Sequence, residues 1–422
     1  MASKQKIVST LALSAATAAM LTLSGCGGSS SSSTTPPPPA ASLGNCDASV
    51  VDVLLTGDIA AQTLDATKVY GIDGRVRLLS GELIAPAGTT FAGCTPSSYL
   101  MIKPGAKLTA IGTQAKPITF TSQVDLLGQS AANEVGEWGG LILLGNAFTD
   151  HGVVGYEAGQ AEDTFGATDH THDTESSGTL DYVLVKHTGF KVAADKELNG
   201  LSMGGVGSGT TITNIAVVGG ADDAMEIWGG TVNVTGYYAY NAKDDSVDTD
   251  LGYRGTITNV YVKQNIVDKT NNHDSAAIET GNDDATFNST YPTLATIVNF
   301  TADVTGAGIY MKNDAGLALN NAQFTSAKTV DTQLATYRTQ DVVDTGTMNI
   351  VSTCMKNASA GQAGDDYLAI ENTKDTGTGK TASTDLSGGL GVAVKINDTS
   401  CTGVNVANIW KGKVGSNDPL EN

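Results

Sequence analysis

A short pattern recurs three times between residues 209 and 256 of this chain. Each copy opens with a Gly-Thr pair, at positions 209–210, 230–231 and 255–256, and continues as a run of alternating apolar residues. The copies are 21 and 25 residues apart, a period that is typical of solenoid proteins and too short for a β-propeller blade or a helical-pair repeat. The repeat therefore predicts a β-solenoid, in which each turn of the coil contributes short strands that pair with the turns above and below it.

The first two copies of the repeat end in acids, Asp222-Asp223 and Asp244-Asp245. The two acid pairs are 22 residues apart, so equivalent carboxylates in consecutive turns would lie about 4.8 Å from each other. Two such charges repel by about 3 kcal/mol at an effective dielectric constant of about 20, and by about 1 kcal/mol in water. The stack therefore requires a cation, a neighbouring Arg or Lys, or exposure to solvent.

The composition favours an extracellular, all-β protein. The chain contains 50 glycines and many Thr, Asn, Asp and Val residues, which suit strands and turns better than helices. Its formal net charge of -20 argues against nucleic acid as a partner and favours divalent cations.

The N-terminus has the features of an export signal. Lys4 and Lys6 precede an apolar run from Ile7 to Leu23, which is too short for a membrane span and ends in small residues. The ending Leu23-Ser24-Gly25-Cys26 resembles the lipobox of bacterial lipoproteins, which implies removal of residues 1–25 and a lipid on Cys26 as the membrane anchor. The next residue is Gly27 and not Asp, which by resemblance to Gram-negative sorting favours the outer membrane.

Residues 26–45 form a tether between this anchor and the folded part. Residues 27–41 read GGSSSSSTTPPPPAA, in which Gly and Ser give flexibility and the prolines give a stiffer, extended piece. No part of this segment can build a core.

Four further cysteines are expected to form disulfides. An even number of cysteines in an exported chain suggests pairing, and four allow three connectivities. Their order along the chain favours Cys46–Cys94 and Cys354–Cys401, one staple near each end of the solenoid.

The remaining chain, residues 46–422, is expected to be a single domain. Residues from about 46 to 70 are predicted to form an N-terminal cap that is helical in places, and residues from about 355 to 422 a C-terminal cap. Two long polar segments, 145–177 and about 264–292, interrupt the period. We expect the first to project from one side of the coil as a loop, because long insertions are where solenoids place binding surfaces.

Two stretches resemble a known class of fold. Residues 102–122 carry Ile-x-Pro-Gly-Ala-x-Leu, then Gly-Thr, then Pro-Ile-x-Phe-Thr, which resembles the rungs of right-handed parallel β-helix proteins of the pectin-lyase-like class. Residues 136–145, Gly-Glu-Trp-Gly-Gly-Leu-Ile-Leu-Leu-Gly, continue that pattern as in bacterial surface lipoproteins of this kind. The fold expected is therefore all-β: a right-handed parallel β-helix with short N- and C-terminal caps.

The acid-rich turns provide the main candidate site. The carboxylates on adjacent turns are Asp222, Asp223, Glu226, Asp244, Asp245, Asp248 and Asp250, with Asp274, Glu279 and Asp314 on later turns. Oxygen ligands from neighbouring turns suit Ca²⁺, which takes about six to eight of them. The alternative is structural, because Asp and Asn at tight corners tolerate left-handed backbone and accept local amide hydrogen bonds.

The resemblance also implies a catalytic alternative. Related β-helix polysaccharide lyases use Ca²⁺ held by stacked Asp residues to neutralise a uronate, which an Arg or Lys then deprotonates. Here Arg254 or Lys243 would be that base, beside Asp223, Asp245 and Asp248. Of the hydrolase motifs of the class, only Asp-Asp has counterparts; Gly-His-Gly and Arg-x-Lys are absent, as is the lyase motif Arg-x-Pro-x-x-Arg.

Two other patterns have simpler interpretations. His170 and His172, flanked by Asp169 and Asp173, could hold zinc or copper, but their surroundings predict a solvated loop. The segment at 375–381 resembles a phosphate-binding loop but lacks its first glycine and the flanking strand and helix.

The aromatic residues of the acid-rich turns can fill the coil or stack on sugar rings. Alternation places Tyr238 and Tyr240 on one face of their strand and Tyr237 on the other, and the remaining aromatics of this kind are Trp138, Trp228 and Tyr253. Filling of the coil or stacking among the rings is favoured over a carbohydrate platform.

These observations predict a lipid-anchored β-helix protein of the outer membrane. It would act as a non-catalytic binding or structural module with Ca²⁺ as its candidate ion and carbohydrate or surface proteins as candidate partners. The alternative is a polysaccharide lyase or glycoside hydrolase.

Overall fold

The computed structural model describes residues 42–192, 196–265, 275–282, 291–305, 307–312, 315–325, 336–340, 349–352, 355–357, 369–372 and 401–412. The described part of the chain belongs to one compact unit, Leu43–Asn422. Several predicted features lie outside the described residues: Cys26 and the tether up to residue 41, Asp274, Asp314, Cys354 and the segment 375–381. In the part of the chain that is described, no helix has both the length and the apolar character needed to cross a membrane.

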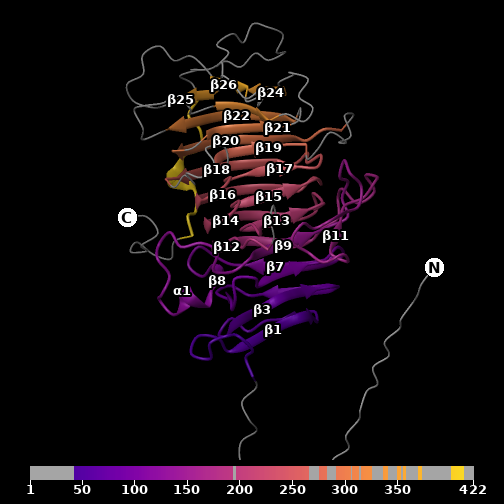
Figure 1. Ribbon diagram of the computed structural model, residues 1–422, viewed down its shortest axis with the longest axis vertical. Helices are drawn as coiled ribbons and strands as arrows, with labels where there is room; N and C mark the ends of the chain where they lie inside the picture. The colour runs from indigo at the N-terminus through magenta and orange to yellow at the C-terminus, as the bar shows by residue number, and fades with distance from the viewer. Residues whose placement is uncertain are drawn as a thin grey trace, which may run out of the picture. The chain divides into compact units, whose positions relative to one another are not determined.

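The strands stack as one parallel coil, as Figure 1 shows. One column consists of short strands: β6 (Tyr99–Ile102), β9 (Gly140–Leu144), β13 (Leu201–Gly204), β15 (Met225–Trp228), β17 (Asp248–Asp250), β19 (Ala276–Thr280), β21 (Ala307–Lys312), β23 (Thr336–Gln340) and β26 (Ala369–Asn372). A second column consists of long strands: β12 (Gly178–Thr188), β14 (Thr211–Gly220), β16 (Asn233–Ala242), β18 (Thr256–Gln264), β20 (Leu294–Val304) and β22 (Gly316–Thr325), followed by β24 (Asn349–Ser352) and β25 (Met355–Asn357).

The first turns of the coil are less regular. They comprise β1 (Val53–Ile59), β2 (Gln62–Thr63), β3 (Val69–Leu78), β4 (Gly81–Ala85), β5 (Thr90–Gly93), β7 (Ala106–Ile111) and β8 (Ile118–Ser122). β7 and β8 together pair with β12, so two short strands support the first long one. The expected all-β, right-handed parallel β-helix is confirmed. The polar segment expected near 264–292 contains the strand β19.

The core lies inside the coil and is built from side chains in register. Ile212, Val234, Ile257 and Ile297 occupy equivalent positions in successive long strands, and each is almost completely buried. Burial of each such side chain contributes about 1.5 to 3 kcal/mol. The alternating apolar pattern in the sequence therefore corresponds to the inward face of each strand.

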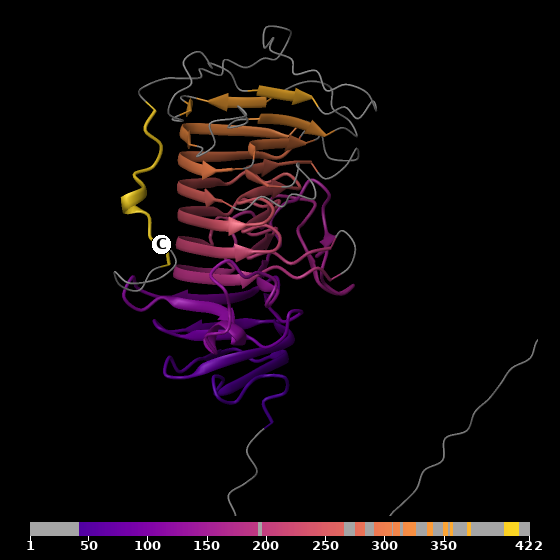
Figure 2. The ribbon, with the colours of Figure 1, turned by 60° about the vertical axis from the view of Figure 1, so that its left-hand side comes forward.

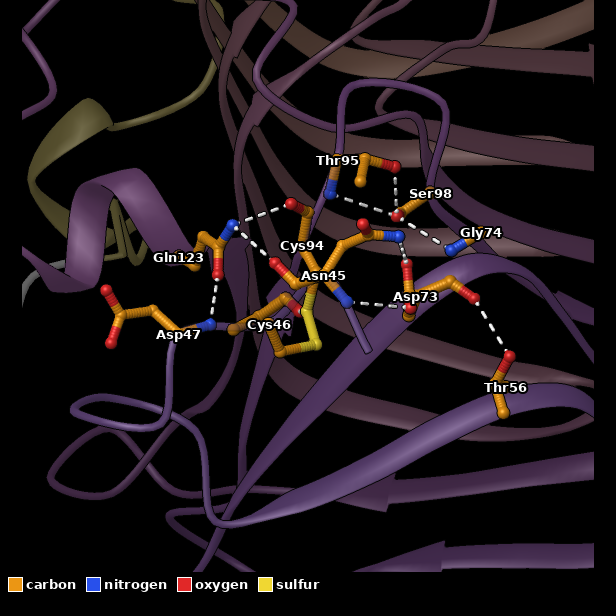
Figure 3. The surroundings of a disulfide bond; sticks show 11 residues. Asn45, Cys46, Asp47, Thr56, Asp73, Gly74, Cys94, Thr95, Ser98 and Gln123 are labelled. Atoms are coloured by element: carbon orange, nitrogen blue, oxygen red, sulfur yellow. Dashed lines mark hydrogen bonds between the residues drawn. A yellow bond between two sulfur atoms is a disulfide. The ribbon is translucent and has the colours of Figure 1, made fainter. Parts of the chain in front are cut away.

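The N-terminal segment differs from its expected structure. Residues 53–63 were expected to be partly helical, but β1 and β2 are strands, and β1 pairs in parallel with β3. The predicted disulfide Cys46–Cys94 is confirmed and lies beside this first turn (Figure 3). A methyl group on Gly71 would lie 2.5 Å from the Cys46 sulfur, so glycine is required where the chain passes the disulfide.

The disulfide is fixed further by Gln123 at the start of the short helix α1 (Gln123–Leu126). The side-chain amide of Gln123 donates to the carbonyl oxygen of Cys94 at 2.6 Å, and its oxygen accepts the Asp47 N–H at 2.7 Å (Figure 3). On the other side, Asn45 donates to the Asp73 carboxylate from its backbone and its side chain. The N-terminal staple is thus attached to two separate turns of the coil.

The insertion at 145–177 packs against the coil and does not project freely. It contains a small antiparallel hairpin, β10 (Val154–Gly155) with β11 (Thr164–Phe165). Its residues Tyr156 and Phe165 pack on Met101, Ile142 and Leu144, which point outward from the short-strand column. The expectation of a projecting loop is therefore corrected: the insertion covers an apolar outer face.

Residues 401–412, which we call the C-terminal strap, run along the side of the coil (Figure 2). They contain the single-turn 3-10 helix η1 (Val406–Asn408). Cys401 is disulfide-bonded, while its expected partner Cys354 lies outside the described residues. The strap therefore differs from the expected cap, because it lies against strand faces and not over the end of the coil.

Candidate metal-binding site

The acid pairs occupy one corner of the coil. Asp222 and Asp223 lie between β14 and β15, and Asp244 and Asp245 lie between β16 and β17. The predicted stacking of equivalent acids is confirmed, because Asp223 Oδ1 accepts the backbone N–H of Asp245 at 2.8 Å. This corner therefore places acid over acid in consecutive turns.

A ladder of hydrogen bonds runs up this corner. Asn199 Oδ1 accepts the N–H of Asp223 at 3.2 Å, and Asp245 Oδ1 accepts the N–H of Ala276 in the same way. Asn199, Asp223 and Asp245 thus each accept the amide of the turn above. One side-chain oxygen of each of these three residues therefore binds the backbone of the next turn, as expected for Asp and Asn at a corner.

A second column of acids lies on the outward face of the short strands. Glu226, Asp248 and Glu279 are in register on β15, β17 and β19, and Ser202 of β13 occupies the equivalent position one turn earlier. The residues on either side of Glu226 point into the core, so alternation along the strand directs the Glu226 carboxylate outward. Glu279, expected on a third turn, is confirmed there.

The corner acids and the strand acids meet in two triads. Carboxylate oxygens of Asp222, Asp223 and Asp244 all lie within 4.8 Å of one another, and the same holds for Asp223, Glu226 and Asp248. Asp223 belongs to both triads. Oxygens that bind one Ca²⁺ at about 2.3 to 2.6 Å from opposite sides are separated by up to about 5 Å, so each triad can share an ion.

The acids of the triads are difficult to ionise together. Burial, followed by the charge of Asp244, raises the pKa of Asp222 well above its ordinary value, and burial with the charge of Asp222 does the same for Asp223. Burial with the charge of Asp248 raises the pKa of Glu226. Burial with the charge of Glu279 raises the pKa of Asp245. Protonation is therefore a further way to relieve the predicted repulsion, besides a cation.

Sequence reasoning missed several groups around this site. Asn199 donates to Glu226 Oε2 at 2.5 Å and lies 24 residues before Asp223. The repeat period, extended one turn backward, could have identified it. Glu157 of the insertion and Glu197 both raise the pKa of Asp222. Lys191 lowers that pKa and forms an ion pair with Glu197. No regular spacing connects these last three residues to the repeat.

The remaining predicted site residues Arg254, Lys243 and Asp250 are not members of the two triads. The Arg254 guanidinium lies 4.1 Å from the centre of the Tyr291 ring and donates to the carbonyl oxygen of Pro292 at 2.9 Å. The backbone N–H of Lys243 donates to Gly220 at the acid corner. Asp250 Oδ1 accepts the N–H of Leu251 at 2.6 Å.

The histidine pair lies in a solvated turn of the insertion. His170 Nδ1 lies 2.8 Å from an Asp173 oxygen, and His172 Nδ1 lies 3.2 Å from a Glu175 oxygen. About half of each imidazole is exposed. Each ring is thus paired with the acid three residues later, and neither histidine belongs to the carboxylate triads found among the described residues.

The aromatic residues follow the predicted alternation. Tyr237 lies in the core, whereas Tyr238 and Tyr240 point outward and stack on each other. Trp138 and Tyr253 are core residues as well. Trp228 points outward and packs in a T-shaped arrangement against Tyr156 from the insertion, with the two ring centres 5.6 Å apart.

Comparison with known proteins agrees with this architecture. Residues 57–396 match the family model of the pectate-lyase-like β-helix domain. No curated protein and no solved structure matches the chain. The match spans most of the chain, and the parallel coil of the structure has the architecture that this family's description names. The chain therefore belongs to the family of pectate-lyase-like β-helix domains.

Proposed function

We propose that this protein is a lipid-anchored, extracytoplasmic β-helix module that binds Ca²⁺ at the acid corner and strand face of β15 and β17. The anchor would be the lipid on Cys26 in the outer membrane, and the partners would be carbohydrate or other surface proteins. The observation that carries the proposal is the pair of carboxylate triads that share Asp223.

The charge balance of the triads supports a cation. Three acids of the triads, Asp222, Asp223 and Glu226, and the neighbouring Asp245 have pKa values raised by burial and by nearby carboxylates. The folded protein must therefore hold protons or positive charge at this place. Lys191 lowers the pKa of Asp222, but it also pairs with Glu197. A divalent ion would neutralise several carboxylates at once and release the protons they hold at neutral pH.

The ligand set favours Ca²⁺ over Mg²⁺. Ca²⁺ accepts a variable number of oxygens in flexible geometry, whereas Mg²⁺ demands near-ideal octahedral geometry and retains several waters. The acids come from corners and from strand faces, and Asp223 and Asp245 also accept backbone amides. Such an irregular set of oxygens suits the more tolerant ion.

Calorimetric titration of the EDTA-treated protein with Ca²⁺ tests the proposal. Glu226→Gln and Asp248→Asn are the informative variants, because they remove charge from one triad and leave the corner ladder of Asp223 and Asp245 in place. We expect each to weaken Ca²⁺ binding by about tenfold or more, since one charged ligand is lost. Asp303→Asn, an acid on β20 outside the triads, is the matched control and should bind as the wild type does.

Two results together would contradict Ca²⁺ binding: the wild-type protein gives no heat on titration with Ca²⁺, and its unfolding midpoint is the same in EDTA and in Ca²⁺. Cys26→Ser, followed by membrane fractionation, tests the anchor separately. We expect this variant to be released from the outer membrane; if it fractionates with the membrane as before, the anchor is not the Cys26 lipid.

A second candidate function is a polysaccharide lyase or hydrolase. The observation that favours it is the raised pKa of Glu226 beside the carboxylate of Asp248, since an acid that retains its proton next to a carboxylate suits general acid catalysis. A panel of polyuronates and neutral glycans, assayed for unsaturated products and reducing ends, tests it. Turnover lost in Glu226→Gln would support hydrolysis, and turnover lost in Arg254→Ala or Lys243→Ala would support the lyase.

A further inference from the structure

The C-terminal strap is bound at its upper end by side chains of β20 and β22. Asn321 Oδ1 accepts the N–H groups of Thr402 and Gly403 at 2.9 and 3.1 Å, and its amide donates to the Gly403 carbonyl oxygen. Thr301 Oγ1 accepts the N–H of Val404 at 3.0 Å. The upper half of the strap is therefore held mainly through its backbone.

The lower end of the strap is held by apolar contacts with earlier strands. Ile409 and Trp410 are more than nine-tenths buried in a cluster formed with Leu184, Ala216, Val218, Tyr238 and Tyr261. The Trp410 ring meets Tyr182 edge-on at 5.3 Å. A methyl group on Gly412 would lie 2.6 Å from a Leu184 methyl, so the strap approaches β12 closely.

The strap matches the outer face that it covers. One outward column of the long strands reads, in register from β12 to β22, Leu184, Ala216, Tyr238, Tyr261, Thr301 and Gln323. The column is apolar or aromatic over its first four strands and polar over its last two. The apolar end of the strap lies on the apolar part, and the backbone hydrogen bonds lie on the polar part.

The strap connects turns of the coil that are not neighbours. In a solenoid each turn contacts only the next one, so stability is a sum over neighbouring pairs and the ends can fray independently. The strap joins β22 to β12 past four intervening long strands. Because the face under the strap is assembled from several strands, the strap can dock only after these strands have stacked.

We propose that the strap is a clamp that couples β12 to β22 across the intervening turns, so that this part of the coil opens as one unit. The clamp is independent of the acid site. Its function is conformational: loosening one anchor of the strap lowers protection at the other, because coupling between two sites is reciprocal.

Hydrogen exchange of the full-length chain, read by mass spectrometry, tests the clamp. Trp410→Ala removes the lower anchor, and we expect the amides of β20 and β22, at the other end of the strap, to lose about tenfold in protection, the effect of losing an aromatic contact. Asn408→Ala changes an exposed strap residue and should leave protection unchanged. Loss confined to β12, β14 and β16, or an equal loss in Asn408→Ala, would overturn the proposal.

The reverse experiment uses Thr301→Val. This substitution retains the shape of the side chain and removes the hydroxyl that bonds to Val404. Protection should then fall at β12 and β14, far from the change, and a fall confined to β20 and β22 would contradict the clamp. The measurement remains available if Trp410→Ala does not fold.

Discussion

Asparagine occupies the bend in the middle of four long strands, β14, β18, β20 and β22, because the backbone there is left-handed. Asn214, Asn259, Asn299 and Asn321 lie at equivalent positions of their strands, and each has a φ angle between +50° and +58°. Asparagine tolerates this left-handed region better than other residues with a side chain. Asn299 donates to Asn259 at 3.0 Å and accepts from Asn321 at 2.8 Å, so these three side chains form a ladder.

Replacement of the central member of this ladder should destabilise the coil. Asn299→Ala places alanine in the left-handed region, at about 1 to 2 kcal/mol, and removes two hydrogen bonds of about 1 kcal/mol each. We expect the free energy of unfolding in urea to fall by about 3 to 4 kcal/mol. Asn299→Gly is the control: it removes the hydrogen bonds but relieves the backbone, so it should be the less destabilised variant. Equal losses would show that the backbone angle contributes nothing.

At the scale of elements, the insertion is fixed to the coil by a buried carboxylate. The Asp163 side chain is fully buried and meets Arg77 and Lys103, each at 3.1 Å, and Arg75 at 3.2 Å. Burial disfavours its charge, but the Gln160 N–H, Arg77 and Lys103 outweigh this and hold the pKa of Asp163 below its ordinary value. The ion pairs therefore stabilise the docked insertion above the ordinary pKa of Asp, and this contribution is lost as the pH falls through the lowered pKa.

Neutralising this carboxylate should release the insertion while the coil stays folded. Asp163→Asn leaves three cations without their shared partner, and breaking such a buried pair costs about 3 kcal/mol. We expect faster hydrogen exchange between residues 153 and 166. Glu162→Gln is the matched control, because the Glu162 carboxylate touches the same arginines but is 57% exposed, so its effect should be small. The same exchange rates in both variants would contradict a special role for Asp163.

At the scale of the whole molecule, the protein has an excess of acids, with a formal net charge of -20, and several of these acids are stacked in the two triads. The pKa values of Asp222, Asp223, Glu226 and Asp245 are raised in the folded state. Without a cation, the folded state then binds more protons than the unfolded state above the ordinary carboxylate pKa of about 4. Stability must decrease as the pH rises through that window.

This reasoning gives a test that uses the intact protein. In EDTA, the thermal midpoint should fall between about pH 5 and about pH 8, because the acids lose protons that the folded state retains. In excess Ca²⁺ the fall should be much smaller, since an ion that binds only the folded state stabilises it by about 2.7 kcal/mol at 100 times its dissociation constant. If the thermal midpoint falls with pH by the same amount in EDTA and in Ca²⁺, no ion is bound at these acids.

The features predicted correctly share a local origin. The stacking of Asp223 under Asp245 follows from a constant period, and the opposite faces of Tyr237 and Tyr238 follow from strand alternation. The Cys46–Cys94 pairing followed from chain order alone. Ca²⁺ binding, the lipid on Cys26 and the outer-membrane location remain predictions.

The features predicted wrongly depend on contacts between distant segments. Residues 53–59 have an amphipathic mix compatible with a helix, and pairing with β3 makes them a strand. The polar composition of the insertion predicted a projecting loop. In the structure, its residues Tyr156 and Phe165 form an apolar side that packs against Met101 and Ile142. Glu157, Glu197 and Lys191 act on the pKa of Asp222, and no regular spacing connects them to the repeat.

The sequence by itself determined the parallel coil and its acid column, because a repeat with constant period and strict alternation specifies both which residues face inward and which residues stack. Only the tertiary structure decided how the irregular segments use that coil. The cover formed by residues 145–177 and the strap formed by residues 401–412 each depend on complementarity with an outer face assembled from several turns. That face exists only after the turns have stacked, so no local pattern in the chain encodes it.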